Sequence, residues 1–482
     1  MTGARRILIR DLDQVATPAG TSAPLRGASL GALELVEDAF VLLHDEVIEA
    51  VGPMRKVPRL DGEVEELDGR GVAVVPGLVD CHTHPAFAGD RAHEFALRAR
   101  GASYEELLAA GGGILSTTRA TRAAGPDELS QLVVRHRDAM LAHGTTTFEG
   151  KSGYGLDHDT ELAQLEAIAA AGGVPTWLGA HAVPPEHPDA DAYVDWAIEA
   201  VLPDAARIAT AADVFVERGT FDVEQARRYL EACRRAGLDL RLHGDQLNEI
   251  GAVGLAVELG ARSIDHLEAT GSEGVAALAA SDVVGVLLPV AALYLNRPMP
   301  PGRALVDAGA AIALATDFNP GSAYCESLPV VCTLACTQLG LAPEEALAAC
   351  TVNAAHVLGL SDRGRVAPGY RADLVLLDAR DEGFFACLSG ASDLTSLALR
   401  TVSFPSPSIS TRSYWCRFSF ARRRRCFWFA IRRLCPREGD PTCTDHGPHE
   451  VARKVVGQVP PVVRIEQDEV GAIAGGDAAA VR

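Results

Sequence analysis

Long apolar runs are absent from this chain of 482 residues. No stretch of about 18 uncharged apolar residues occurs, so a membrane-spanning helix is not expected. The first residues contain a short apolar run, Ile7–Ile9, which cannot form the hydrophobic core of a signal peptide. These absences predict a cytoplasmic protein with no membrane partner.

Paired cysteines are also absent. The 11 cysteines are scattered, and no two of them are separated by only two residues. This argues against a zinc site built from Cys-x-x-Cys pairs and against a disulfide framework. Free thiols in a reducing compartment are the simpler interpretation.

Positive charge is scarce relative to negative charge. The 44 Lys and Arg residues are outnumbered by 64 Asp and Glu residues, which gives a net charge of −20. Nucleic-acid binding requires clustered basic residues, so such a partner is not expected. Since 48% of the residues are hydrophobic, the chain can bury a large core. An enzyme acting on a small molecule agrees best with this composition.

The early part of the chain, residues 1–70, contains short β segments separated by Asp and Gly turn signals. We expect these segments to form the N-terminal part of a small β domain. They are Phe40–His44, Glu46–Val51 and Val64–Leu67.

The pattern changes between residues 71 and 360, where short β-branched runs alternate with longer helical stretches. This alternation predicts a parallel sheet with helical crossovers. Eight strands with crossovers predict an α/β fold, a (β/α)8 barrel of the TIM type. The strands are expected at Val72–Val79, Thr145–Glu149, Pro175–Gly179, Asp213–Glu217, Asp239–Leu242, Arg262–Asp265, Val283–Leu288 and Ala311–Ala315. Helices are expected at Asp159–Ala171, Val223–Ala236, Gly251–Leu259 and Gly274–Ala280.

The remainder of the chain divides into two parts. Residues 361–382 contain a Gly/Pro turn and an apolar strand, which we expect to return to the small β domain and complete a β-sandwich from both chain ends. Residues 383–482 form an atypical tail. Between Leu394 and Arg437 it has ten Arg but no Lys, Asp or Glu. Such a stretch can bind an acidic surface, but its lack of periodicity favours a shifted reading frame and poor order.

Candidate metal ligands lie at the ends of the predicted barrel strands. His82 and His84 follow the first strand, and side chains two residues apart on an extended chain point the same way. His243, His266 and Asp317 close the fifth, sixth and eighth strands. All these ends face one mouth of a closed barrel, where active sites of this fold lie. The set suits Zn²⁺ or iron with a position left for water.

A bound metal would activate water and polarise a carbonyl group. Hydrolysis also needs a proton acceptor and a proton donor. Asp317 can act as ligand and acceptor together, and the histidine that is not a ligand can polarise the carbonyl or transfer a proton.

The segment Pro76–His84, together with His243, His266 and Asp317, resembles the amidohydrolase superfamily. Further motifs resemble the imidazolonepropionase family within it, over residues 30–380 approximately. These motifs are Gly89–Phe95, Gly111–Ile114, Thr117–Arg122, Glu149–Leu156, Gly179–Pro184 and Thr316–Ser322. The resemblance implies hydrolysis of 4-imidazolone-5-propanoate to N-formimidoyl-L-glutamate, the third step of histidine degradation, in a homodimer.

The resemblance also implies roles for individual residues. His82, His84, His243 and Asp317 would bind one Zn²⁺ or Fe³⁺ per subunit, and His266 would act next to the attacked carbonyl. The substrate-binding residues would be Arg91, Tyr104, Tyr154, His181, Asn319 and Gly321. Arg91 and Tyr154 would hold the propanoate carboxylate, which a guanidinium fork suits.

Two residues bear on the mechanism. Members of the family often have Glu at the position of Gln246, three residues after His243. A neutral amide can orient substrate or water but cannot accept a proton, so His266 or Asp317 would be the base. Lys151 follows the second predicted strand, not the fourth, where some amidohydrolases bridge two metals with a carboxylated lysine. A single metal is therefore expected, with an ion-pair or substrate-pocket role open for Lys151.

Two other functions remain possible on the sequence alone. A deaminase acting on an amino-substituted ring would share the metal site but would not need Arg91 and Tyr154. A non-catalytic protein could tether to an acidic surface through Arg422–Arg425.

Overall fold

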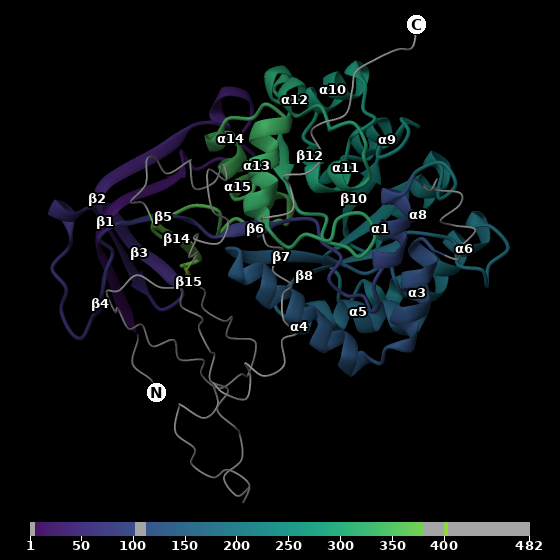
Figure 1. Ribbon diagram of the computed structural model, residues 1–482, viewed down its shortest axis with the longest axis horizontal. Coiled ribbons are helices and arrows are strands. Elements are labelled where there is room, and N and C mark those ends of the chain that lie inside the picture. Colours follow the sequence, from purple (N-terminus) through teal and green to yellow (C-terminus); the bar gives the residue numbers. More distant parts are fainter. Residues whose placement is uncertain (1–4, 102–111, 379–399, 403–482) are drawn as a thin grey trace, which may run out of the picture. The chain divides into compact units, whose positions relative to one another are not determined.

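The computed structural model describes residues 5–101, 112–378 and 400–402 of the chain. Its strands form two sheets, one with eight strands and one with seven (Figure 1). The atypical tail predicted for residues 383–482 lies outside the described residues, apart from the three at 400–402.

The eight-stranded sheet follows the order of the chain, and each pair of neighbouring strands is parallel. Helical segments separate the strands, so the expected (β/α)8 barrel is confirmed. The strands are β6 (Leu78–Asp80), β7 (Thr145–Lys151), β8 (Val174–Ala180), β9 (Ala211–Val216), β10 (Asp239–Gly244), β11 (Ser263–His266), β12 (Val284–Leu287) and β13 (Ile312–Leu314).

The first and last strands of this sheet meet just beyond their carboxyl ends. A parallel bridge joins Thr83 to Phe318. The backbone N–H of Asp317 donates to the carbonyl of His82 at 3.0 Å, and that of His84 donates to Phe318 at 2.8 Å. These bonds close the barrel where the candidate ligands lie.

Helices cover the outside of the strands; α4 packs against β7 and α5 against β8 (Figure 1). The four helices expected from the sequence are confirmed as α5, α8, α9 and α10. The described helices are α1 (Ala92–Ala99), α3 (Ile114–Ala123), α4 (Pro126–Ala142), α5 (His158–Ala170), α6 (Ala190–Trp196), α7 (Leu202–Ala205), α8 (Val223–Arg235), α9 (Ala252–Leu259), α10 (Ser272–Ala279), α11 (Pro289–Tyr294), α12 (Gly302–Ala308), α13 (Leu328–Gln338), α14 (Pro343–Ala349) and α15 (Val352–Val357). Short turns of other helix types are η1 (Gly27–Ser29), η2 (Met54–Lys56) and η3 (Ala197–Val201).

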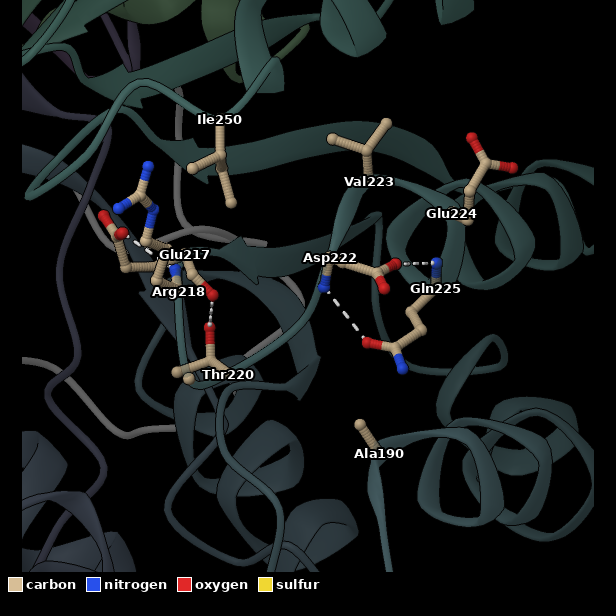
Figure 2. A pocket seen from close by; sticks show the side chains of 10 residues that line it. Ala190, Glu217, Arg218, Thr220, Asp222, Val223, Glu224, Gln225 and Ile250 are labelled. Atoms are coloured by element: carbon tan, nitrogen blue, oxygen red, sulfur yellow. Dashed lines mark hydrogen bonds between the residues drawn. The ribbon is translucent and has the colours of Figure 1, made fainter.

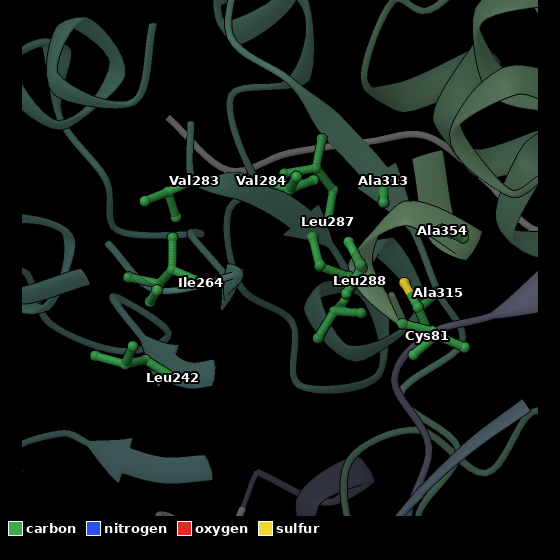
Figure 3. Packing of buried hydrophobic residues seen from close by; sticks show 14 of the residues in the cluster. Cys81, Leu242, Ile264, Val283, Val284, Leu287, Leu288, Ala313, Ala315 and Ala354 are labelled. Carbon is green, nitrogen blue, oxygen red and sulfur yellow. The ribbon is translucent and has the colours of Figure 1, made fainter. Parts of the chain in front are cut away.

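The barrel strands alternate in character along their length. Leu242, Ile264 and Leu287 lie on the successive strands β10, β11 and β12 within one buried apolar cluster (Figure 3). The neighbouring positions Arg241 and Asp265 are also fully buried but charged. Since side chains of a strand point alternately to its two faces, the apolar set faces the helices and the charged set faces the barrel interior.

The second sheet has the order β15-β14-β5-β1-β2-β3, with β4 beside β1. Its described strands are β1 (Arg6–Pro18), β2 (Leu33–His44), β3 (Val47–Pro53), β4 (Glu65–Asp68), β5 (Val72–Pro76), β14 (Leu374–Asp378) and β15 (Arg400–Val402). Strand β14 pairs with β5, so a late segment of the chain joins a sheet of early segments. The division into a barrel domain and a separate β-sandwich domain stays a prediction.

The prediction of one strand over Val72–Val79 is wrong. The chain leaves the second sheet after Pro76 and enters the barrel at Leu78. Gly77 lies between the two strands, where a Cβ atom would collide with Thr146. Because the run Val72–Val79 is apolar throughout, the sequence does not reveal that the chain passes from one sheet to the other within it.

In the described segments, no helix has both the length and the apolar composition needed to cross a membrane.

Candidate metal centre and active site

Four side chains meet where the first and last barrel strands close. The Nε2 atoms of His82 and His84 are 3.3 Å apart. Asp317 Oδ1 lies 3.3 Å from the first of these nitrogens and 3.4 Å from the second. His243 Nε2 lies 3.4 Å from His84 Nε2. The structure thus brings together all four residues predicted to bind the metal.

These distances agree with ligands around one ion. A tetrahedral ion about 2.0–2.1 Å from each ligand atom separates the ligand atoms from one another by roughly 3.3–3.4 Å. His82, His84, His243 and Asp317 are each at most 3% exposed, so water does not screen them. Three imidazole nitrogens and one carboxylate oxygen are a donor set that zinc and iron accept. The residues present therefore fit the metal that the sequence implies.

Burial sets the charge of the imidazoles. It lowers the pKa of His84 well below the ordinary value and lowers that of His243, so both rings are neutral. Burial also opposes charge on His82, but Asp265 and Asp317 raise the pKa of this ring to about 9. A metal bound through Nε2 of His82 would displace that proton, because ligands must be deprotonated.

Two buried carboxylates orient the ligand histidines. His82 Nδ1 donates to Asp265 Oδ2 at 2.6 Å, and His243 Nδ1 lies 3.0 Å from Asp213 Oδ2. The hydrogen bond of His82 places its proton on Nδ1 and turns the lone pair of Nε2 toward the cluster. His243 Nδ1 lies close to the Asp213 carboxylate, but the pair does not have hydrogen-bond geometry. Carboxylates in this position fix the tautomer and direction of metal-ligating histidines.

His266 lies beside the ligand cluster. Its ring centroid is 5.3 Å from that of His243 and 5.7 Å from that of His82. Its φ of 88° is unusual for a residue other than glycine. Such backbone strain persists where the surrounding structure imposes it, commonly at functional sites. Nδ1 of this ring lies 3.4 Å from Glu268 Oε1.

Arg91 lies at the start of α1, with its side chain 13% exposed. Its Nε and Nη2 donate to Glu94 Oε2 at 2.9 and 2.7 Å. The guanidinium packs on Gly321, where a Cβ atom would collide with Nη1. In the described part of the chain Nη1 has no hydrogen-bond partner, so this edge of the fork can receive a ligand.

The rings of Tyr154 and His181 lie next to each other and to His84. Their ring centroids are 5.2 Å apart, and His181 is stacked on His84 at 5.7 Å. Burial raises the pKa of Tyr154, so its phenol stays a donor. Burial also lowers the pKa of His181 to about 3. Nδ1 of this neutral ring donates to the carbonyl of Gly153 at 2.8 Å, which leaves Nε2 as an acceptor.

The loop that carries Tyr154 is held by one carboxylate. Glu161 accepts hydrogen bonds from the backbone N–H groups of Gly153, Gly155 and Leu156 at 2.8–3.1 Å. The phenol and the Gly153 carbonyl are thereby fixed relative to each other.

The other predicted site residues are Asn319, Gln246 and Tyr104. Asn319 uses its whole amide within its own loop: Nδ2 donates to Asp317 and Ser322, and Oδ1 accepts from Gly321 and Ser322. It can shape the pocket but has no donor left for a substrate. Gln246 is 9% exposed and lies two residues after β10. Tyr104 lies outside the described residues.

A separate pocket of about 530 Å³ lies beside the loops after β9 and β10 (Figure 2). Glu217, Arg218, Asp222 and Gln225 line it, and the last two form the capping box that begins α8. No predicted site residue lines this pocket, so it is distinct from the candidate metal centre.

Four charged residues inside the barrel were not predicted from the sequence. Asp213 and Asp265 support two ligand histidines, and Glu149 and Arg241 lie fully buried next to them. A signal for them exists in the sequence. Charged or imidazole side chains occur two residues apart near the ends of strands, as in Glu149 and Lys151 or Arg241 and His243.

Comparison with known proteins gives a consistent assignment. The sequence profile of the amidohydrolase family matches residues 73–405. An imidazolonepropionase of Rubrobacter xylanophilus is 58% identical over 402 residues, which cover 81% of this chain and 96% of that protein. An imidazolonepropionase of Chloroflexus aggregans is 46% identical over 395 residues, covering 78% and 92%.

Solved structures support the fold. An adenosine deaminase of Xanthomonas campestris with bound zinc has a TM-score of 0.58 at 19% identity, covering 79% of this chain and 88% of that one. At this identity the likeness extends to the fold alone. The extent and identity of the sequence matches show that the chain belongs to the amidohydrolase family and, within it, to the imidazolonepropionases.

Proposed function

We propose that this protein hydrolyses 4-imidazolone-5-propanoate to N-formimidoyl-L-glutamate. The observation that carries the proposal is the 3.3–3.4 Å spacing of the His82, His84 and Asp317 ligand atoms, next to a cationic residue suited to a propanoate. In the reaction, the carbonyl carbon gains the oxygen of water, the ring C–N bond breaks, and the released nitrogen takes a proton.

The metal would be held by His82, His84, His243 and Asp317. When bound, such an ion supplies Lewis acidity, which makes water a nucleophile near neutral pH. We propose one Zn²⁺ or Fe³⁺ per chain. The zinc in the structurally similar deaminase supports a metal in this fold.

The residues around the cluster have separate tasks in this proposal. Nη1 of Arg91 and the phenol of Tyr154 bind the propanoate carboxylate by charge-assisted hydrogen bonds. Nε2 of His181 accepts a hydrogen bond from a ring N–H, and Gln246 orients the ring.

Proton transfer falls to two residues. Asp317 accepts a proton from water, and His266 polarises the carbonyl or delivers a proton to the leaving nitrogen. An amide at position 246 cannot take a proton, so the acceptor must come from the strand ends.

Arg91→Ala tests this reading against the deaminase alternative. Loss of a charged hydrogen bond costs about 1.5–3 kcal/mol, so kcat/KM for imidazolonepropanoate should fall roughly 10- to 150-fold. An imidazolone analogue without the carboxylate is the control and should be turned over equally by both proteins. An unchanged kcat/KM for imidazolonepropanoate would reject the proposed role of Arg91 in binding the propanoate carboxylate.

The homodimer and the cytoplasmic location rest on the family resemblance and composition. Sedimentation of the purified protein at micromolar concentration tests the first, and a mass of one chain would reject it.

A further inference from the structure

Lys151 ends β7 inside the barrel and is 0% exposed. Its Nζ donates to Asp213 Oδ2 at 2.7 Å, to Glu149 Oε1 at 3.1 Å and to Asp265 Oδ2 at 3.5 Å. An ammonium has three protons, and three carboxylates from three different strands receive them. Burial opposes the charge, but these carboxylates together raise the pKa of Lys151 above its ordinary value.

Two of these carboxylate oxygens also contact a candidate metal ligand. Asp265 Oδ2, which faces Lys151, also accepts from Nδ1 of His82 at 2.6 Å. Asp213 Oδ2, which faces Lys151, also lies 3.0 Å from Nδ1 of His243. One ammonium is therefore connected, through two single oxygen atoms, to two of the four candidate metal ligands.

The same place could attract a cation. Asp213, His243 and Asp265 bring ligand atoms within 4.8 Å of one another, which is a spacing that a metal ion can occupy. The Lys151 ammonium already contacts both carboxylates of this group. It therefore supplies the positive charge that a second metal would otherwise supply.

We propose that Lys151 is a positioning residue for a single metal. Its ammonium holds Asp265 against Nδ1 of His82 and Asp213 against Nδ1 of His243. The proposal rests on the metal site proposed above and deepens it. Without the ammonium, the two carboxylates repel each other, and each can rotate away from its histidine. The histidines then lose the contacts that direct Nε2 toward the ion.

Arg241 provides a matched control. It is also buried inside the barrel and pairs with Glu149, but among the described residues it makes no hydrogen bond or ion pair with a ligand histidine or with Asp213 and Asp265. Its charge acts on these two aspartates only from a greater distance. Removing its charge disturbs the same buried network but removes no direct contact with the two aspartates that face the metal ligands. A purely structural role for Lys151 predicts equal effects of Lys151→Met and Arg241→Met on zinc affinity.

The experiment measures the Zn²⁺ dissociation constant by chelator competition for the full chain, Lys151→Met and Arg241→Met. Loss of a residue behind the ligands typically weakens metal binding 10- to 100-fold, and we expect this for Lys151→Met but less than about threefold for Arg241→Met. Zinc stoichiometry and the thermal midpoint of the metal-free proteins are recorded in parallel. Equal zinc affinity of Lys151→Met and the unaltered chain would overturn the proposal. Absence of zinc binding in the unaltered chain would instead reject the metal site itself.

A second measurement needs no folded variant at position 151. The sequence has only three lysines, Lys56, Lys151 and Lys454, so NMR of ¹⁵N-lysine-labelled protein gives a simple spectrum. Lys56→Arg and Lys454→Arg assign the other two signals. We expect the Lys151 ammonium signal to shift when Zn²⁺ is added while the signal of exposed Lys56 stays in place. A Lys151 signal that does not move would overturn the proposal.

Discussion

Gly321 shows how a residue without a side chain can act at this site. The Arg91 guanidinium lies on the face of this glycine, and Arg98 Nη2 donates to its carbonyl at 2.7 Å. Sequence resemblance placed Gly321 among the substrate-binding residues. The structure supplies the physical reason, which is room for the cation that would bind the propanoate.

Gly321→Ala should therefore weaken substrate binding. A methyl group would displace the guanidinium, and overpacking of this kind costs about 1–3 kcal/mol. We expect KM for imidazolonepropanoate to rise roughly 10-fold with little change in kcat. Steady-state kinetics measures this, with Gly254→Ala as control because a Cβ there meets nothing within 4 Å. Equal KM values for Gly321→Ala and Gly254→Ala would contradict the account.

Residues at the strand ends could be predicted because their types and positions are both distinctive. His82, His84, His243 and Asp317 each follow or close an apolar strand, and barrel topology brings such ends together. Asp213 and Asp265 were harder to recognise. A lone acidic residue in a strand does not reveal which histidine it will face, since this depends on the register between strands.

The segments that follow β6 and β13 meet at the bridge between Thr83 and Phe318, and a buried carboxylate reinforces this contact. Asp80 ends β6, and its two oxygens accept hydrogen bonds from the N–H of Thr316 at 3.1 Å and from its hydroxyl at 2.7 Å. Asp317, a candidate metal ligand, follows directly. Asp80 thus sets the relative position of the segments that carry His82 and Asp317.

Asp80→Ala should destabilise the protein and weaken metal binding together. Two buried donors on Thr316 would lose their partner, at a cost of about 2–4 kcal/mol in unfolding free energy. Denaturant titration and zinc content measure the two effects. Asp80→Asn keeps one acceptor, so its unfolding free energy and zinc content should lie between those of the unaltered protein and Asp80→Ala. A loss of unfolding free energy below about 0.5 kcal/mol in the alanine variant would show that the carboxylate does not hold these two segments together.

Element boundaries show where sequence patterns stop being informative. The helices α5, α8, α9 and α10 were predicted to within about two residues because their periodicity is strong. The longest strand, β1 over Arg6–Pro18, was missed because aspartates interrupt its apolar pattern. Asp11 has a φ of 54° at the point where the pairing with β2 shifts register. A local irregularity of this kind is read from a sequence as a turn.

At the scale of the whole molecule, the described residues all belong to one compact unit, residues 1–411. The family profile ends at residue 405, so the matched sequence lies within this unit. The predicted metal ligands, and every other predicted site residue, fall before residue 322. Catalysis should not require the residues that follow the unit.

A chain that ends at Thr411 should keep its activity. We expect kcat/KM within about twofold of the full chain and the same zinc content, since no site residue is removed. Kinetics and metal analysis of the shortened protein test this. A shortened protein that folds but loses turnover would show that residues 412–482 contribute to the reaction.

The central claim is that one metal ion at His82, His84, His243 and Asp317 makes this chain an imidazolonepropanoate hydrolase. The most direct measurement follows turnover and metal content together, through removal of the metal by a chelator and stepwise return of Zn²⁺ or iron, with His84→Ala alongside. The account predicts that activity disappears with the metal, returns in proportion to occupancy up to one ion per chain, and stays absent in His84→Ala. Full turnover by metal-free protein, or by His84→Ala, would contradict it.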